Sequence, residues 1–378
     1  MDFVISNDKN FELNSKVFNK ITFKKLSIFL KKRNYKKFKD KNNIYYIFGN
    51  INGLYDKKFN LSKINNSKLI KTLNNNKQFL LDGKFLILRL NENYLQLSTD
   101  YFNRYEVYYN NTKEILISSS LEIFKYKKSI KKKLDKLSIA HSLSVYGNRP
   151  FKEDTIYFDI SRVAPNQNIY LKSKKLQFKK FNFRPLRTNP KFGEDQFKEY
   201  TSAFLNTLKA KKHGRLNIIY LSSGWDSTSI LAGLVRITNK KNIKCVIGRM
   251  KYSKNKIANT FEISRAKKIC DFYGVKLEIT DFDYYKDSKI YNSDLYSFLN
   301  NNQLASITSI NHFYLAKFVK QKFGDDCYVF CGEISDGSHN LGFSQYVSIY
   351  HPASYDFREY SDKMNSYLFG PTFLNFVY

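Results

Sequence analysis

The sequence is poor in cysteine, proline, tryptophan and acidic residues. Its 378 residues include four Cys, six Pro and one Trp. So few cysteines exclude a disulfide-stapled scaffold and indicate a reducing compartment. No apolar run is long enough to cross a bilayer, because even the stretch at residues 85–90 is interrupted by Arg89. The first ten residues lack the basic and apolar segments of a signal peptide, so we expect a cytoplasmic protein without membrane association.

The scarcity of acidic residues leaves a large positive charge. The 33 Asp and Glu residues stand against 64 Lys and Arg, which gives a formal charge of +31. A chain this basic is attracted to polyanions such as nucleic acid. Most of the cations are lysine, however, whereas arginine is the side chain that contacts phosphates and bases in bidentate geometry. Abundant Lys, Asn, Ile, Tyr and Phe are typical of A/T-rich coding sequence. The charge therefore favours compositional bias over a nucleic-acid partner.

Short strand patterns and polar turns fill the first 160 residues. Turn signals such as Asp82 followed by Gly83 separate apolar runs, which predicts a β-rich domain. Two lysine-rich stretches, residues 31–41 and 125–136, are expected to be helical or looped. Residues 180–195 contain prolines and no periodicity, which predicts a linker. We therefore expect one domain at residues 1–179 and another at residues 196–378.

Strand and helix patterns alternate after residue 196. Strands are expected at residues 216–221, 242–248, 275–280 and 327–331, and helices at residues 227–237, 259–273 and 307–323. This alternation predicts an α/β fold with a doubly wound parallel sheet. Ligands of such sheets bind at the carboxyl ends of the strands.

Small and polar residues form the loop after the first of these strands. They are Ser222, Ser223, Gly224, Trp225, Asp226 and Ser227. Small residues let backbone N–H groups approach a phosphate, and the N-terminus of the next helix adds a partial positive charge. The hydroxyls of Ser222 and Ser227 can donate to phosphate oxygens. Asp226 repels phosphate unless a divalent cation lies between them. The alternative is that these residues only cap a helix.

This loop resembles the S-G-G-x-D-S loop of ATP pyrophosphatases, and it is not a Walker A loop. The wider chain is similar to the glutamine-dependent asparagine synthetases. Asp82, Gly83 and Phe85 resemble the DGxF strand of their amidotransferase half, and residues 155–165 resemble the connector that follows it. Residues 331–336, C-G-E-I-S-D, resemble the S-G-E-G-A-D motif.

The resemblance implies an α+β, Ntn-type amidotransferase-like sandwich followed by an α/β ATP pyrophosphatase domain. The implied ATP-binding residues are Leu221, Ser222, Ser223, Gly224, Asp226, Ser227, Ile247 and Gly332. Asp226 and Asp336 are the implied Mg²⁺ ligands. Glu333 is the implied catalytic residue, which positions or deprotonates an incoming amine.

The implied activity is that of an ATP-dependent amide ligase. A small-molecule carboxylate is activated as an acyl-adenylate with release of pyrophosphate, and ammonia or an amine then displaces AMP. The resemblance is compatible with a homodimer. A tRNA-modifying ATP pyrophosphatase and a non-catalytic scaffold remain open as alternatives.

The sequence departs from this family at several positions. Position 2 is Asp instead of the nucleophilic Cys, so we expect an inactive glutaminase. Ser223 replaces the first glycine of the loop, and we expect its Cβ to keep φ negative or to weaken ATP binding. Gly337 replaces an acidic residue. The chain ends at Tyr378, earlier than the family does, so we expect an incomplete C-terminal domain.

We assign ordinary structural roles to several other residues. Glu262 follows Asn259 at capping-box spacing, so we interpret it as part of a helix cap. His312 has no evident nucleophile or metal partner. Cys327 and Cys331 lie in an apolar run, and we expect buried strand thiols there instead of a zinc site.

Overall fold

The computed structural model divides the chain into two compact units. The N-terminal unit comprises Met1–Ser142 and Arg149–Gln196, and the C-terminal unit comprises Leu143–Asn148 and Phe197–Tyr378. The structure describes residues 1–40, 42–56, 60–75, 77–110, 114–126, 133–144, 153–165, 167–172, 175–180, 193–254, 256–284, 295, 297–298 and 307–332. Within these residues, no helix has the length and apolar character that a bilayer crossing needs.

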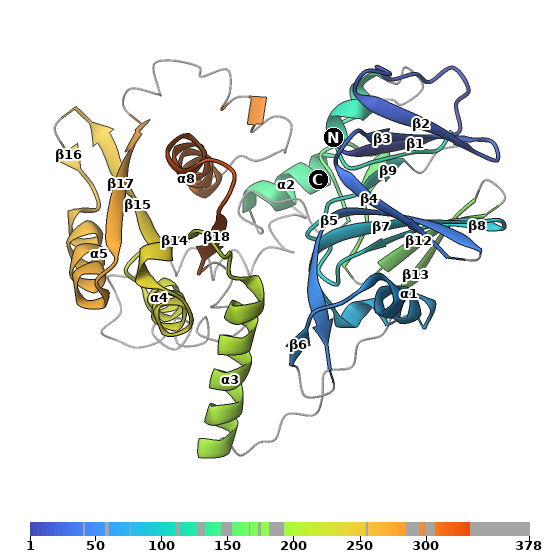
Figure 1. Cartoon of the computed structure of the whole chain (residues 1–378). Helices are drawn as coiled ribbons and strands as arrows, with labels where there is room; N and C mark the ends of the chain where they lie inside the picture. Colours follow the sequence, from blue (N-terminus) through green and yellow to red (C-terminus); the bar gives the residue numbers. More distant parts are fainter. Residues whose placement is uncertain are drawn as a thin grey trace. The chain divides into compact units, whose positions relative to one another are not determined.

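The N-terminal unit is built on two antiparallel sheets (Figure 1). The first has the order β11-β9-β10-β1-β3-β2. Its strands are β1 (Phe3–Ser6), β2 (Phe18–Phe23), β3 (Leu26–Lys31), β9 (Tyr108–Asn110), β10 (Leu116–Ser118) and β11 (Ile160–Arg162). The second has the order β13-β12-β8-β7-β5-β4, with β6 beside β5. Its strands are β4 (Tyr35–Lys39), β5 (Asn43–Tyr55), β6 (Leu61–Ser62), β7 (Leu81–Asn91), β8 (Tyr94–Thr99), β12 (Gln167–Lys172) and β13 (Lys175–Lys180).

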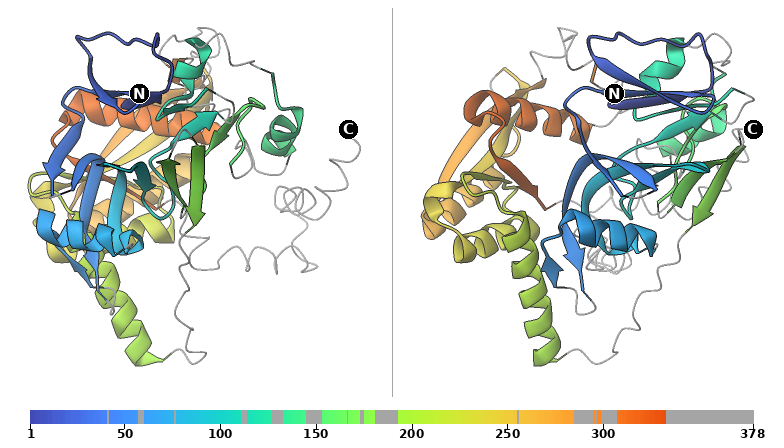
Figure 2. Two further views of the ribbon diagram at one scale, coloured as in Figure 1. Left: turned by 90° about the vertical axis from the view of Figure 1, so that its right-hand side faces the viewer. Right: turned by 45° about the vertical axis from the view of Figure 1, so that its right-hand side comes forward.

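Alternating side chains give this unit three apolar layers. Phe3 from β1 joins Phe48 and Leu86 from the second sheet in the core between the sheets. On the outer face of the first sheet, Val4 packs with η2 (Leu121–Tyr126). On the outer face of the second sheet, strand residues pack with α1 (Asn66–Asn74), which lies against it in both views (Figure 2). The unit also contains η1 (Gln78–Leu80) and α2 (Lys136–Ser144).

The lysine-rich stretch at residues 31–41 is not helical or looped as expected, because Tyr35–Lys39 forms strand β4. Tyr35 lies opposite Phe48 in the register with β5 and packs on the inner core. Phe38 points to the other face and stacks on Tyr45 with ring centroids 4.8 Å apart. One aromatic side chain on each face holds this strand to the sheet, and its lysines face solvent.

The C-terminal unit has one mainly parallel sheet. Its parallel strands are β14 (Asn217–Tyr220), β15 (Ile243–Ser253), β17 (Lys276–Asp283) and β18 (Tyr328–Cys331), and the short β16 (Lys256–Ile257) is antiparallel to β15. Strand β14 lies between β15 and β18, and β17 lies beside β15. The helices are α3 (Glu194–Lys211), α4 (Trp225–Ile237), η3 (Lys240–Asn242), α5 (Thr260–Tyr273) and α8 (Ile307–Phe323).

Helices cover both faces of this sheet. Ile219 of β14 packs in one apolar cluster with residues of α3, α4 and α5. Its neighbour Ile218 points the other way, into a cluster with Leu315 and Val319 of α8. Figure 1 shows α8 and α4 on opposite sides of the strands. The structure thus confirms a mixed α/β architecture with several sheets.

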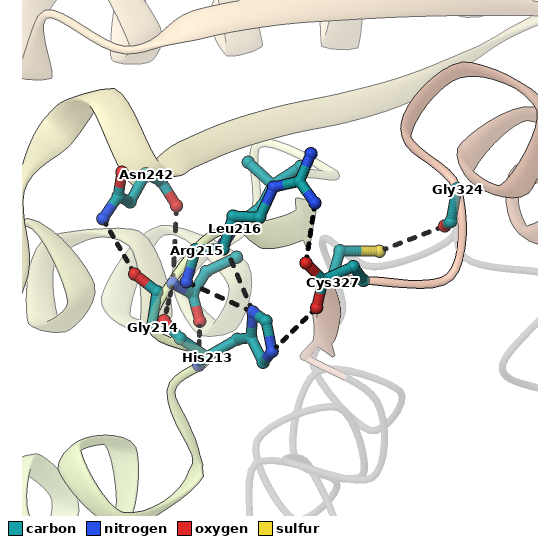
Figure 3. Close-up of polar contacts among 9 residues, drawn as sticks. His213, Gly214, Arg215, Leu216, Asn242, Gly324 and Cys327 are labelled. Atoms are coloured by element: carbon teal, nitrogen blue, oxygen red, sulfur yellow. Dashed lines mark hydrogen bonds and ion pairs between the residues drawn. The ribbon is translucent and has the colours of Figure 1, made fainter.

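A polar network joins the starts of the strands, at the edge opposite their carboxyl ends (Figure 3). The buried Asn217 accepts a hydrogen bond from His213 N at 2.7 Å and donates to His213 O at 3.0 Å and to Asn242 O at 3.4 Å. Arg215 Nη1 and Asp326 Oδ2 lie 2.7 Å apart. These contacts connect the segments that lead into β14, β15 and β18.

Candidate functional site

Strand register brings distant parts of the sequence together at the carboxyl edge of the parallel sheet. Tyr220 is paired with Val246 of β15 on one side and with Cys331 of β18 on the other. The next residues along these three strands are Leu221, Ile247 and Gly332. Because β14 lies between its immediate successor β15 and the later strand β18, the topology switches direction here, and this is where α/β sheets bind ligands.

Hydroxyl groups hold the loop after β14 closed against the first turn of α4. Ser222 N donates to Ser227 Oγ at 3.2 Å, and the two serine hydroxyl oxygens also lie 3.2 Å apart. Ser227 Oγ donates to Gly224 O at 3.3 Å. Gly224 is the N-cap of α4 and provides no side-chain cap. The loop therefore does not cap α4 through a side chain, and the first N–H groups of the helix lack intrahelical acceptors.

Ser223 adopts a backbone conformation that favours glycine. Its φ is +62°, in the left-handed region, and the residue is only 4% exposed. The expectation that its Cβ keeps φ negative is therefore wrong, because the closed loop imposes the left-handed conformation at a cost of about 1–2 kcal/mol. Ser223 is also the one predicted ATP-binding residue that does not line the cavity described next.

A cavity of about 330 Å³ lies at this edge of the sheet. The predicted residues that line it are Leu221, Ser222, Gly224, Asp226, Ser227, Ile247 and Gly332. Its volume is within the range of small-molecule sites. Glu333 and Asp336 lie outside the described residues, so the structure assigns them no position.

Gly332 joins the two sequence motifs in space. A Cβ added to Gly332 would lie 2.9 Å from both Asp226 Cβ and Ser227 N. The end of β18 thus packs directly on the first turn of α4, and only glycine leaves room for that approach.

Asn259 and Glu262 do not form the expected capping box. The Asn259 side chain accepts a hydrogen bond from Met250 N at 2.9 Å and donates to Gly248 O at 2.8 Å, so it fixes the start of α5 to β15. It provides no side-chain cap to α5. It also donates to Glu262 Oε2 at 3.3 Å, and Glu262 lines the cavity. The signal that could have revealed Glu262 is its place in the first turn of a helix that follows a parallel strand.

Further residues that the sequence did not assign to the cavity also line it, among them Tyr220, His312 and Cys331. His312 of α8 lies with its ring centroid 6.4 Å from that of Tyr220. Burial raises the pKa of Tyr220 to about 12, so its phenol keeps its proton at neutral pH. Cys331 is exposed and Cys327 is half-buried, which corrects the expectation of two buried strand thiols.

The described part of the chain contains no group of three or more His, Cys, Asp or Glu side chains that could hold a metal ion. Asp226 is the carboxylate that the loop itself contributes to the cavity. A single carboxylate beside phosphate oxygens fits Mg²⁺, which is usually held by one or two carboxylates together with substrate phosphates. The uncapped N–H groups of α4 and the open cradle at Gly224, where an added Cβ would meet only Ser222 Oγ at 3.5 Å, fit a phosphate chain.

Position 2 of the N-terminal unit carries a hydrogen-bonded carboxylate. Asp2 accepts hydrogen bonds from the Tyr105 hydroxyl and from Asn34 Nδ2, the latter at 2.8 Å, and its N–H donates to Ser119 Oγ at 2.8 Å. Burial, together with the hydrogen bond to Asp2, raises the pKa of Tyr105. Asp2 thus acts as a structural acceptor at the place where the sequence lacks a nucleophilic thiol.

Fold and site together define an α/β protein with a cavity at the carboxyl edge of its parallel sheet, beside the N-terminus of α4. The sequence matches no family model and no curated protein. Among solved structures it is weakly similar to NAD synthetases and to amidotransferases. The NH3-dependent NAD synthetase from Campylobacter jejuni is 16% identical over 35% of this chain and 55% of its own, with a TM-score of 0.24. The glutamine-dependent NAD+ synthetase from Acinetobacter baumannii, solved with ADP, is 17% identical over 56% and 44%, with a TM-score of 0.27.

The glutamine phosphoribosylpyrophosphate amidotransferase from B. subtilis, solved with ADP and GMP, is 11% identical. It matches 68% of this chain and 51% of its own, with a TM-score of 0.26. The chain thus spans about half the length of these three proteins.

Proposed function

We propose that the C-terminal unit binds ATP in the cavity at the ends of β14, β15 and β18 and is an ATP-dependent amide ligase resembling asparagine synthetases. The observation that supports the proposal is the contact between Gly332 and the Asp226–Ser227 peptide, because the serine loop (residues 222–227) and the end of β18 line one cavity. We propose residues 196–378 as the ligase domain and residues 1–179 as a degenerate amidotransferase-like domain, with residues 180–195 as the linker between them.

The residues of this loop suit the binding and orientation of a phosphate chain. The α4 N-terminus and the Ser222 and Ser227 hydroxyls would bind the β- and γ-phosphates, and the backbone of Leu221, Ile247 and Gly332 would contact the rest of the nucleotide. Asp226, with Asp336, would hold Mg²⁺. The ion, when bound, neutralises the negative charge that develops on departing pyrophosphate.

The proposed reaction has two steps. A carboxylate oxygen of the acid attacks the α-phosphorus, an O–P bond forms, and the bond to pyrophosphate breaks. The nitrogen of ammonia or an amine then attacks the acyl carbon, the C–O bond to AMP breaks, and the nitrogen loses a proton. Glu333 is the residue we propose to accept that proton. Because Asp2 cannot attack glutamine as a thiolate does, the nitrogen would come from free ammonia or an amine.

Pyrophosphate release tests this proposal. We expect the purified chain to release pyrophosphate from ATP and Mg²⁺ with one member of a carboxylate panel that begins with aspartate, in the presence of ammonium or amines. Asp226→Asn should lower the rate at least 100-fold. Asp271→Asn is the matched control, because Asp271 is an exposed carboxylate on α5 that does not line the cavity, and it should leave the rate unchanged.

Other outcomes identify the alternatives. Pyrophosphate release that requires tRNA and falls steeply with salt would indicate a tRNA-modifying enzyme. ATP binding can be measured through the fluorescence of the exposed Trp225 at the start of α4. Absence of ATP binding would indicate a non-catalytic scaffold. Glutamate release from glutamine by the pure chain would contradict the inactive glutaminase.

A further inference from the structure

A second cavity, of about 460 Å³, lies between α3 and α4. Three residues, Asp226, Cys331 and Gly332, line both this cavity and the one at the strand ends. A molecule in the second cavity would therefore lie directly beside the loop at residues 222–227. Two reactants bound in the two cavities would meet at this shared wall.

Two facing helix stripes form the sides of the second cavity. From α3 they include Phe197, Tyr200, Thr201, Phe204 and Leu205, and from α4 they include Asp226, Ser229, Ile230, Ala232, Gly233 and Arg236. The spacing within α3 is that of a single helix face. A Cβ on Gly233 would lie 2.5 Å from Leu208 Cδ1 and 3.1 Å from Phe204 Cε1, so the absence of a side chain there lets the two helices pack closely.

Aromatic side chains dominate the α3 side and remain accessible. Phe197 is 57% exposed and Tyr200 is 50% exposed, although both border the cavity. Burial of such surface by a ligand is favourable because it removes apolar area from water. A planar apolar group stacks well on aromatic rings in addition.

The charges along α4 orient an acid in this cavity. The N-terminus of α4, which carries a partial positive charge, lies at the shared wall and attracts a carboxylate. Asp226 lies at the same wall, and its negative charge opposes a second carboxylate unless the Mg²⁺ proposed there neutralises it. Arg236 lies ten residues after Asp226, about 15 Å further along the helix at 1.5 Å per residue, out of reach of a small acid bound at the shared wall. Arg236 is exposed and makes no ion pair with any residue that the structure describes.

We propose that the cavity between α3 and α4 binds the acid that the C-terminal unit activates, and that this acid has an aromatic body with its carboxylate at the shared wall. The inference rests on the proposed function and names the substrate class of the same site. Aspartate fits this cavity less well, because its second carboxylate would lose water against the aromatic walls without a cation within reach.

Direct binding tests the substrate class without turnover. We expect 3-phenylpropionate, titrated by calorimetry and by the fluorescence of Trp225, to bind at least tenfold more tightly than aspartate in the presence of Mg²⁺ and the absence of ATP. Phe197→Ser should weaken that binding at least fivefold. Phe272→Ser is the matched control, because Phe272 is an 81% exposed residue of α5 outside the cavity, and it should have no effect.

A second variant guards against an effect on folding alone. Ser229→Phe fills the cavity from an exposed position of α4, and it should abolish phenylpropionate binding while ATP affinity stays unchanged. Tighter binding of aspartate, or phenylpropionate binding that resists both variants, would overturn the inference. Weakening by Arg236→Gln would also overturn it, because the carboxylate would then lie at the wrong end of the cavity.

The two proposals can fail separately. If aspartate supports pyrophosphate release and Phe197→Ser leaves that rate unchanged, the ligase stands and the aromatic substrate class is wrong. If phenylpropionate binds in a Phe197-dependent manner but ATP does not bind, the preference of the cavity is supported and the ligase is wrong.

Discussion

Gly332 lies against Asp226 so closely that a single methyl group on Gly332 would overlap the Asp226 side chain and the Ser227 N–H. The φ of Gly332 is not in the left-handed region, so space alone requires glycine at this position. This contact gives the first prediction.

Gly332→Ala should lower ATP affinity at least tenfold, because the added methyl group must displace the backbone of α4 or the end of β18. We also expect a loss of about 1–3 kcal/mol in the free energy of unfolding, the usual cost of overpacking. Calorimetry and urea unfolding measure the two effects. Gly214→Ala is the control, because an added Cβ there meets no atom within 4 Å. Unchanged ATP affinity in Gly332→Ala would show that this contact does not shape the site.

Ser223→Gly should stabilise the C-terminal unit. Glycine adopts the φ of +62° without the strain that a Cβ imposes, so we expect the free energy of unfolding to rise by about 1 kcal/mol. Ser223→Ala keeps the Cβ and should give no such gain. Urea unfolding followed by circular dichroism compares the three proteins, and equal stability of the serine and glycine forms would contradict strain at this position.

Asn217→Leu should destabilise the parallel sheet. The side chain is fully buried and bonded to His213 N, His213 O and Asn242 O, so its loss leaves backbone groups without partners. We expect a loss of about 2–4 kcal/mol. Asn206→Leu on α3 outside this network is the comparison. A thermal midpoint equal to that of the parent chain would mean that water replaces these hydrogen bonds at no cost.

Alkaline pH should destabilise the N-terminal unit. Burial raises the pKa of Tyr45 to about 12, whereas an unfolded tyrosine titrates near 10. Between these values the unfolded chain loses a proton that the folded chain keeps. The contribution of Tyr45 is therefore constant below about pH 10 and falls by about 1.4 kcal/mol per pH unit from there to about pH 12, in addition to that of other buried tyrosines such as Tyr105.

Urea unfolding between pH 8 and 11.5 measures this slope. Tyr45→Phe should reduce it, with a constant loss from the hydrogen bond to Asp40 Oδ2 at every pH. Tyr126→Phe, at a 71% exposed position, is the control. An identical slope in the Tyr45→Phe protein would assign the alkaline transition to other groups.

Hydrophobic periodicity predicted the regular elements of the C-terminal unit closely. The expected helix at residues 307–323 is α8 (Ile307–Phe323), and the expected strand at residues 327–331 is nearly β18 (Tyr328–Cys331). Apolar residues of both segments pack in the core of the unit, among them Leu315 and Val319 of α8 and Phe330 of β18, so the pattern of each segment reveals its structure. Strand β15 extends to Ser253, beyond the expected end, because its last residues pair with β16 and β17.

Long-range contacts explain what the sequence did not reveal. Strand β4 looks like a solvated lysine-rich loop until β5 supplies the register that buries Tyr35 and Phe38 on opposite faces. The left-handed φ of Ser223 is imposed by the hydroxyl contacts of the loop, which no local propensity encodes. Asn259 has the spacing of a cap, but β15 lies near enough to take its hydrogen bonds.

The place of β14 between β15 and β18 also makes the cavity a late product of folding. Two of its lining residues, Cys331 and Gly332, are translated more than 100 residues after the serine loop, and they reach their place only when β18 pairs with β14. A nascent chain that stops before β18 has the serine loop but not the complete cavity. Because a ligand stabilises only the states that bind it, nucleotide should act on this chain as a selective stabiliser of the fully assembled sheet.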